Sequence, residues 1–172
     1  MVMIMKSLMV CQNSKSASQL SFALFAGFII FTQADTFAAE HTISKMKAPS
    51  PVLILSNSNI DPGVGFAVFD ILYPDIPAGT LVRPKQLLEI SWRTTYYPGT
   101  INEDIELCYF LPFSSQNNCE KIYPNASGTL MLFNDQAFGH GSKVVINHKV
   151  LGGARPYARP AGVDSVSFKY RY

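Results

Sequence analysis

Apolar and polar residues alternate along most of the chain beyond residue 62, and a period of two predicts half-buried β-strands. In the final segment, Val166, Phe168 and Tyr170 share one face, while Ser167 and Lys169 share the other. The alternation is clearest in four segments, at residues 86–96, 103–111, 143–150 and 164–172. Shorter patterns favour strands at residues 65–73, 119–123 and 129–133, with residues 52–55 as a candidate leading strand.

Glycine and proline interrupt the chain at short intervals between these segments, and no uninterrupted stretch has the apolar period of 3.6 that a helix requires. Seven or eight short strands within residues 63–172 predict an all-β fold. We expect an antiparallel β-sandwich that is Ig-like or resembles a small barrel. Gly63 and Gly65, like Gly139 and Gly141, are interpreted as turn glycines, because neither pair precedes a helix as a phosphate loop does.

Residues 1–38 have the pattern of a secretory signal peptide. Lys6 and Lys15 precede an apolar run from Leu20 to Phe31, and small residues follow this run. The run has twelve residues, fewer than the roughly 20 that span a bilayer. We therefore expect the chain to be exported and the signal peptide to be removed after Ala38, with Ala34 as the alternative cleavage site.

Residues 39–62 are interpreted as a linker or N-terminal extension, because they are polar and contain Pro49, Pro51 and Pro62. The folded domain is then expected at residues 63–172. Without the signal peptide the chain holds 12 Lys and Arg against 11 Asp and Glu, a net charge of +1. This balance gives no basis for nucleic-acid binding, which needs clustered basic charge.

Cys108 and Cys119 are the two cysteines that remain once Cys11 leaves with the signal peptide. An even pair of cysteines in an oxidising compartment predicts a disulfide bond. No histidine stands at metal-ligand spacing from either cysteine. We therefore expect neither a metal nor a cofactor.

No catalytic residue is predicted, and the chain is not expected to be an enzyme. His140 lies near Asp135 and Ser142, but the sequence has no strand-to-helix nucleophile elbow and no obvious oxyanion loop, so this set is interpreted as a polar turn. His148 lies on the apolar face of its strand and is interpreted as a core histidine whose polar groups are satisfied. The carboxylates of residues 103–106 are interpreted as a solvated surface.

The segment from Gly152 to Pro160 is the most unusual part of the domain, since it combines two glycines, two prolines and two arginines. Proline and glycine give the loop a defined shape, and arginine and tyrosine are favoured where proteins meet proteins. We therefore predict that Arg155, Tyr157 and Arg159 bind a partner. An ordinary solvated connection is the alternative.

Several short motifs follow one another through residues 63–172. They are Gly63-Val-Gly65, Ser91-Trp92-Arg93, Leu107-Cys108, Cys119-Glu120, Val150-Leu-Gly-Gly153 with Arg155, and the terminal Val166-x-x-x-Tyr170-Arg171. In this order, and behind a signal peptide, the motifs resemble the FlhE family, which are small periplasmic proteins of bacterial flagellar operons.

The resemblance implies a periplasmic β domain that serves flagellar assembly without enzymatic activity. The roles proposed for the family are guarding the export gate against proton leakage and keeping rod or hook components from assembling prematurely. The implied partners are proteins of the export apparatus, the rod or the hook, with no nucleic acid and no stable membrane insertion. Deletion of the gene is then expected to disturb swarming motility or flagellar placement.

Two other classes stay open on the sequence. A fimbrial subunit or a pilus chaperone is also an exported β protein, and fimbrial subunits end in an aromatic strand as this chain does. Such a subunit lacks a strand and is stabilised by a donated peptide. A secreted hydrolase would depend on His140. Binding through strand edges or loops, without covalent chemistry, is the function that the sequence favours.

Overall fold

The structure is a computed structural model that describes residues 39–55 and 60–172, so the predicted signal peptide lies outside the described residues. These residues form eleven strands and one short 3-10 helix. Every pairing between strands is antiparallel. The predicted all-β antiparallel class is confirmed, although the strands outnumber the seven or eight that we expected.

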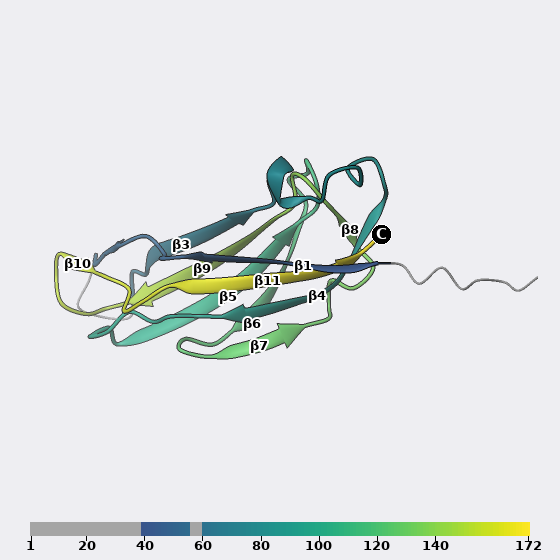
Figure 1. The fold of residues 1–172 in the computed structure, drawn as a ribbon. Coiled ribbons are helices and arrows are strands. Elements are labelled where there is room, and N and C mark those ends of the chain that lie inside the picture. The colour runs from purple at the N-terminus through teal and green to yellow at the C-terminus, as the bar shows by residue number, and fades with distance from the viewer. Residues whose placement is uncertain (1–38, 56–59) are drawn as a thin grey trace, which may run out of the picture. The chain divides into compact units, whose positions relative to one another are not determined.

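Two sheets make up most of the domain (Figure 1). The first has the order β1 (Glu40–Lys47), β11 (Asp164–Arg171), β4 (Lys85–Arg93) and β7 (Ser127–Leu130), and β8 (Ala137–Phe138) pairs with the other end of β4. The second has the order β3 (Gly63–Asp70), β9 (Lys143–Leu151), β5 (Asn102–Phe110) and β6 (Asn117–Ile122). β2 (Val52–Leu53) and β10 (Tyr157–Ala158) form a separate ladder, and η1 spans Tyr73–Asp75.

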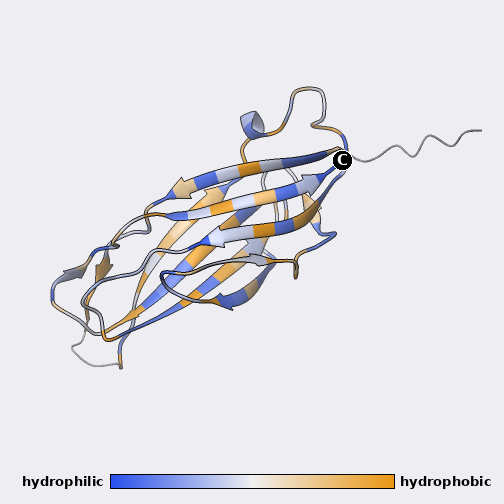
Figure 2. Ribbon diagram, turned by 60° about the horizontal axis from the view of Figure 1, so that its bottom comes forward, coloured by the Kyte–Doolittle hydropathy of each residue, from blue (hydrophilic) through white to orange (hydrophobic). Residues whose placement is uncertain are grey.

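The main core lies between the two sheets. Hydrophobic and hydrophilic residues alternate along the strands (Figure 2), and successive side chains of a strand point to opposite faces of its sheet. Fully buried side chains in this layer include Leu87, Ile90, Leu107, Tyr109 and Phe168. Burying one such aliphatic or aromatic side chain contributes roughly 1.5–3 kcal/mol. The shared apolar layer is therefore the main source of stability.

The inward face of β4 differs from the predicted one at the start of the strand. Simple alternation places Leu88 inward, but Leu87 is fully buried and Leu88 only partly. The register between β4 and β11 shifts at this point, since Lys169 pairs with Glu89 whereas Tyr170 pairs with Leu87. Leu88 is the extra residue of a β-bulge. The side chains before it therefore point to the opposite face of the sheet from the one that simple alternation predicts.

Residues 40–47, which we expected to belong to a linker, form β1, so that prediction is wrong. All eight residues of β1 pair with β11. Ile43 packs against the core, and the ring of His41 stacks on that of Tyr172 with 4.9 Å between the ring centroids. The strand is hard to see in the sequence because an edge strand buries few side chains and keeps a polar composition.

Gly63 and Gly65 lie inside β3, so their interpretation as turn glycines is wrong. A Cβ on Gly65 would lie 2.8 Å from the Ser50 carbonyl oxygen and would also meet the Tyr97 hydroxyl. That hydroxyl donates a hydrogen bond to the same carbonyl oxygen at 2.5 Å. The absence of side chains on these two glycines therefore lets Tyr97 and the segment before β2 pack directly on β3.

Cys108 and Cys119 form the predicted disulfide, which is confirmed. They face each other on β5 and β6, with their Cα atoms 4.0 Å apart. β6 is an edge strand of the second sheet. A covalent link to β5 restricts the freedom of this edge strand to leave the sheet.

Replacing Gly65 with alanine should lower the free energy of unfolding by about 1–3 kcal/mol, the usual cost of overpacking. The new Cβ would press on a backbone carbonyl, which no side-chain rotation can move away. Urea unfolding followed by circular dichroism measures the change. Val64→Ala, at an exposed position of the same strand, is the matched control and should cost less. A Gly65→Ala protein as stable as the unchanged chain would contradict the close approach.

Candidate functional site

Three connections leave the two sheets at the end where β10 lies (Figure 1). They comprise residues 94–101, 123–126 and 152–163. Backbone hydrogen bonds join them, since Asn125 N–H donates to the Thr95 oxygen at 3.2 Å and Ala161 N–H donates to the Tyr96 oxygen at 2.9 Å. We call these three segments the loop end.

The predicted partner-binding residues lie together on the loop end. β10 pairs with β2, and the Pro156 oxygen accepts a hydrogen bond from Ile54 N–H at 2.9 Å, so the loop backbone is anchored. Arg155, Tyr157 and Arg159 are all exposed, Tyr157 to 58%. The loop therefore presents one phenol and two guanidinium groups to solvent on a fixed backbone.

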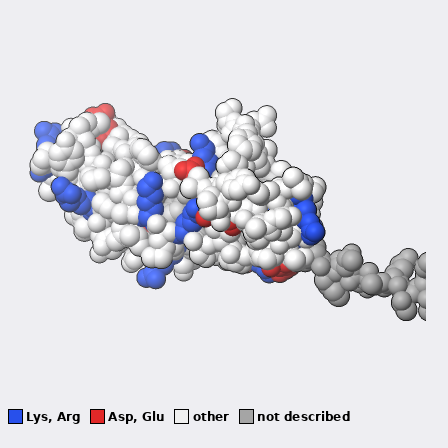
Figure 3. All heavy atoms as spheres, turned by 45° about the horizontal axis from the view of Figure 1, so that its top comes forward, with Lys and Arg blue, Asp and Glu red and all other residues white. Residues whose placement is uncertain are grey.

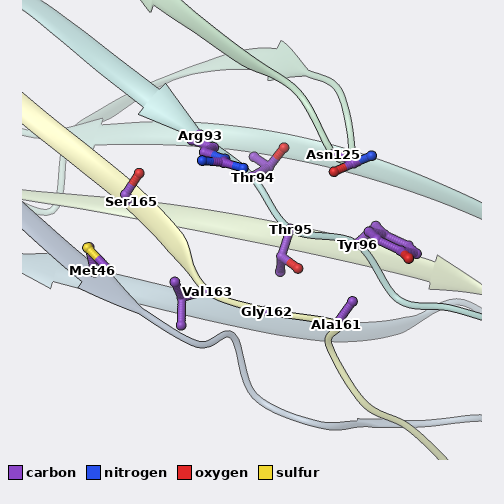
Figure 4. Close-up of a pocket in the computed structure, with 10 residues that line it drawn as sticks. All are labelled: Met46, Arg93, Thr94, Thr95, Tyr96, Asn125, Ala161, Gly162, Val163 and Ser165. Atoms are coloured by element: carbon purple, nitrogen blue, oxygen red, sulfur yellow. The ribbon is translucent and has the colours of Figure 1, made fainter.

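A pocket of about 400 Å³ lies beside this loop (Figure 4). Its polar lining includes the guanidinium of Arg93, the hydroxyls of Thr95 and Ser165, the amide of Asn125 and the phenol of Tyr96. Arg93 is exposed and forms no ion pair with any residue that the structure describes. The pocket is thus suited to a small polar or anionic group.

A buried ionic network fixes one wall of this pocket. His148 on β9 contacts Glu103 on β5 through Nδ1 at 2.6 Å, and Asp164 on β11 through Nε2 at 2.8 Å. The second oxygen of each carboxylate accepts a backbone hydrogen bond. Asp164 accepts from Thr95 N–H at 2.8 Å, and Glu103 accepts from Tyr97 N–H at 3.0 Å. The network therefore joins the two sheets and positions the segment after β4.

The prediction that His148 is a satisfied core histidine is confirmed, whereas the interpretation of Glu103 as a solvated side chain is wrong. The side chains of His148, Glu103 and Asp164 are at most 5% exposed. A signal was present in the alternation, because Glu103 shares the inward face of Ile105, and Asp164 that of Val166. An ionisable residue at an inward position needs a buried partner.

Burial alone would lower the pKa of His148, but hydrogen bonds to Asp164 and Glu103, together with their negative charges, outweigh it and raise the pKa to about 9. The imidazole is therefore protonated at neutral pH and donates to both carboxylates. Burial, and then the same two carboxylates, raise the pKa of Tyr97 well above its usual value. Tyr97 thus stays a neutral donor to the Ser50 carbonyl.

The Ser-His-Asp set considered from the sequence is not assembled. The Ser142 hydroxyl accepts a backbone hydrogen bond at 3.1 Å, and Asp135 pairs with Arg171 at 2.8 Å. The ring of His140 meets that of Phe113 edge-on, with 5.2 Å between the centroids. Within the described ranges, no group of three or more His, Cys, Asp and Glu side chains is placed to hold a metal ion.

Basic side chains are spread along the face shown in Figure 3, several of them at the end that holds β10, where an acidic side chain lies beside them, and most of this face is uncharged. Arg155 and Arg159 form no ion pair with another described residue. The loop end is therefore complementary to a surface that presents acidic or carbonyl groups. Residues 39–55 and 60–172 contain no helix long and apolar enough to cross a membrane.

Fold and site together define a class: a disulfide-bonded, two-sheet antiparallel β domain with an arginine- and tyrosine-bearing loop end. The fold is similar to that of a solved structure described as the crystal structure of FlhE, with a TM-score of 0.52 and 16% sequence identity. The match covers 78% of this chain and 100% of that chain. No protein-family model matches the sequence, and no curated protein matches it.

The network of His148 predicts a loss of stability in mild alkali. A pKa raised from 6.5 to about 9 by folding gives stability that is fully present below pH 6.5 and is lost as the pH rises through 9. We expect the free energy of unfolding to fall across this window, by an amount on the order of 3 kcal/mol. Urea unfolding at several pH values measures the decline.

An NMR titration that follows the carbon-bound protons of the histidine rings tests whether His148 causes this loss of stability. His148 should titrate near 9. A His148 resonance that titrates near 6.5 would show that the two carboxylates do not hold the proton.

Proposed function

We propose that this chain is an FlhE-like periplasmic accessory protein of the flagellum, which binds other proteins and performs no covalent chemistry. The single observation that carries the proposal is the shared fold, which extends over the whole of the FlhE chain. The ordered motifs between Gly63 and Arg171 add sequence support to it. Its partners are components of the export apparatus, the rod or the hook.

The loop end is the surface that we assign to partner binding. Arginine offers a planar set of five N–H donors, and tyrosine offers a large rigid surface with few rotatable bonds. Both residue types are enriched among the side chains that dominate binding energies. Because β2 and the Ile54 backbone anchor the loop, Arg155, Tyr157 and Arg159 lose little conformational freedom when a partner binds.

Two features of the chain support a periplasmic location. Residues 1–38 have the pattern of a cleaved signal peptide. The Cys108–Cys119 disulfide needs an oxidising compartment to form and persist. An exported protein that holds export, rod or hook components would limit proton leakage through the export gate, or delay assembly of these components in the periplasm.

A fimbrial subunit is the competing proposal, and the pairing of β1 weakens it. A subunit of that kind has a sheet that a neighbour completes with a donated strand. Here β1 lies beside β11 over its full length, so the chain itself supplies the neighbour of its C-terminal strand. A deletion strain that loses fimbriae but keeps normal flagella and swarming would favour the fimbrial role.

Replacing both Arg155 and Arg159 with alanine should abolish complementation of a deletion strain in a swarming assay. The same double variant should weaken pull-down of rod, hook or export proteins from periplasmic extracts by about tenfold or more, since each lost contact to a charged group costs 1.5–3 kcal/mol. Tyr157→Ala should act in the same direction.

Lys121→Ala with Lys149→Ala is the matched control, because it also removes two positive charges, both from exposed ion pairs on the second sheet. This control should complement fully. Full complementation by the arginine variant would contradict partner binding by the loop end. Normal swarming of the deletion strain would contradict the flagellar role itself.

A further inference from the structure

A second cavity lies at the opposite end of β4, where the strand begins, with a volume of about 260 Å³. Its lining contains both apolar and basic side chains, and none of the described residues lining it is aspartate or glutamate. The apolar members include Ile76, Leu81 and Phe138, and the basic members are Arg83, Lys85 and His140.

Lys85 is buried, with 6% of its surface exposed. The bulge at Leu88 reverses which side chains face inward at the start of β4, and Lys85 therefore faces inward. Its Nζ donates hydrogen bonds to the backbone oxygens of Thr80 and Arg83, the latter at 3.0 Å. An ammonium has three N–H donors, so two carbonyls leave one of them unused.

Lys85 has no anionic partner among the described residues. The nearby carboxylates are engaged elsewhere, since Asp75 pairs with Lys45 at 2.7 Å and Asp135 pairs with Arg171 at 2.8 Å. Burial, and then the positive charge of Arg83, lower the pKa of Lys85. Besides the two carbonyl oxygens, the ammonium of Lys85 meets the face of the Tyr172 ring, with 5.4 Å between Nζ and the ring centroid. None of these groups carries a negative charge, so the buried ammonium is costly to keep charged, and a bound anion would offset that cost.

We infer that this cavity binds the C-terminal end of a peptide whose last side chain is apolar. The terminal carboxylate would meet Lys85 and Arg83, and the side chain would lie against Leu81 and Phe138. The small volume suits one residue better than a long acyl chain, because cavities for larger organic ligands start at roughly 300 Å³. This inference does not rest on the flagellar role.

Beside this cavity there is space for the peptide residues that precede such a terminus. A further cavity of about 460 Å³ shares Ile76 and Leu81 in its lining and is otherwise formed by the segment from Tyr73 to Gly79. Arg83 is exposed, so its guanidinium is accessible to a carboxylate, which it can bind through two parallel hydrogen bonds. The arrangement fits capture of a free chain end by charge and by one apolar side chain.

NMR titration of the exported protein tests this inference with three probes: N-acetyl-Ala-Leu, its C-terminal amide, and octanoate. The free acid should give saturable amide shifts at residues 81–83, 85 and 137–140. The amide should bind about tenfold more weakly or worse, because it cannot pair with the two cations. Equal binding of acid and amide, or no saturable shift at acid concentrations on the order of 10 mM, would overturn the inference. Tighter binding of octanoate than of the dipeptide would overturn the peptide assignment.

Two variants locate the carboxylate. Arg83→Ala, at an exposed position, should weaken binding of the free acid about fivefold or more while leaving distant resonances unchanged. Lys85→Met keeps the length of the side chain without its charge and should abolish the preference for acid over amide. Undiminished binding by Arg83→Ala would contradict the inference even if Lys85→Met does not fold. The Arg155→Ala, Arg159→Ala protein should bind the dipeptide normally, which separates this test from that of the flagellar role.

Discussion

The protonated imidazole of His148, held between two buried carboxylates, is the interaction on which the arrangement of this domain depends. Glu103 and His148 belong to the second sheet and Asp164 to the first, so the two contacts tie the sheets together at one end. Removing one member of such a buried group costs about 3–5 kcal/mol, because a charge is left unpaired. The same carboxylates hold Thr95 and Tyr97, so the ionic network also sets the path of the backbone beside the Arg93 pocket.

β4 connects this network with the opposite end of the domain. Arg93, at its last position, lines the pocket of the loop end, and Lys85, at its first position, lines the second cavity. A strand without interruption would expose Lys85, because Ile90 and Trp92 fix which face turns inward. The bulge at Leu88 reverses that face for the first residues. One extra residue thus changes a surface lysine into a buried one.

The sequence was sufficient for the strands whose two faces differ in polarity, for the all-β class and for the disulfide. It was insufficient where another part of the chain decides the structure. β1 is recognisable only from its pairing with β11, and the need for glycine at position 65 of β3 is recognisable only from the close approach of Tyr97. The exposed loop around Arg155 could be proposed from composition, and the alternation already placed Glu103 on the inward face of Ile105. Burial of Lys85 depends on a register shift that no local pattern encodes.

The firmly held ionisable groups of the domain and its solvent-exposed groups lie in different places, which supports the proposed binding role. Its most strongly positioned ionisable groups, at His148, Glu103 and Asp164, are sealed from solvent and therefore cannot reach a substrate. The side chains that do reach solvent at the loop end are guanidinium and phenol groups, which form contacts but are poor acids and bases near neutral pH. A cross-linked interior that presents such groups on anchored loops would hold the proposed binding surface in one conformation, and this would lower the entropy lost when a partner binds.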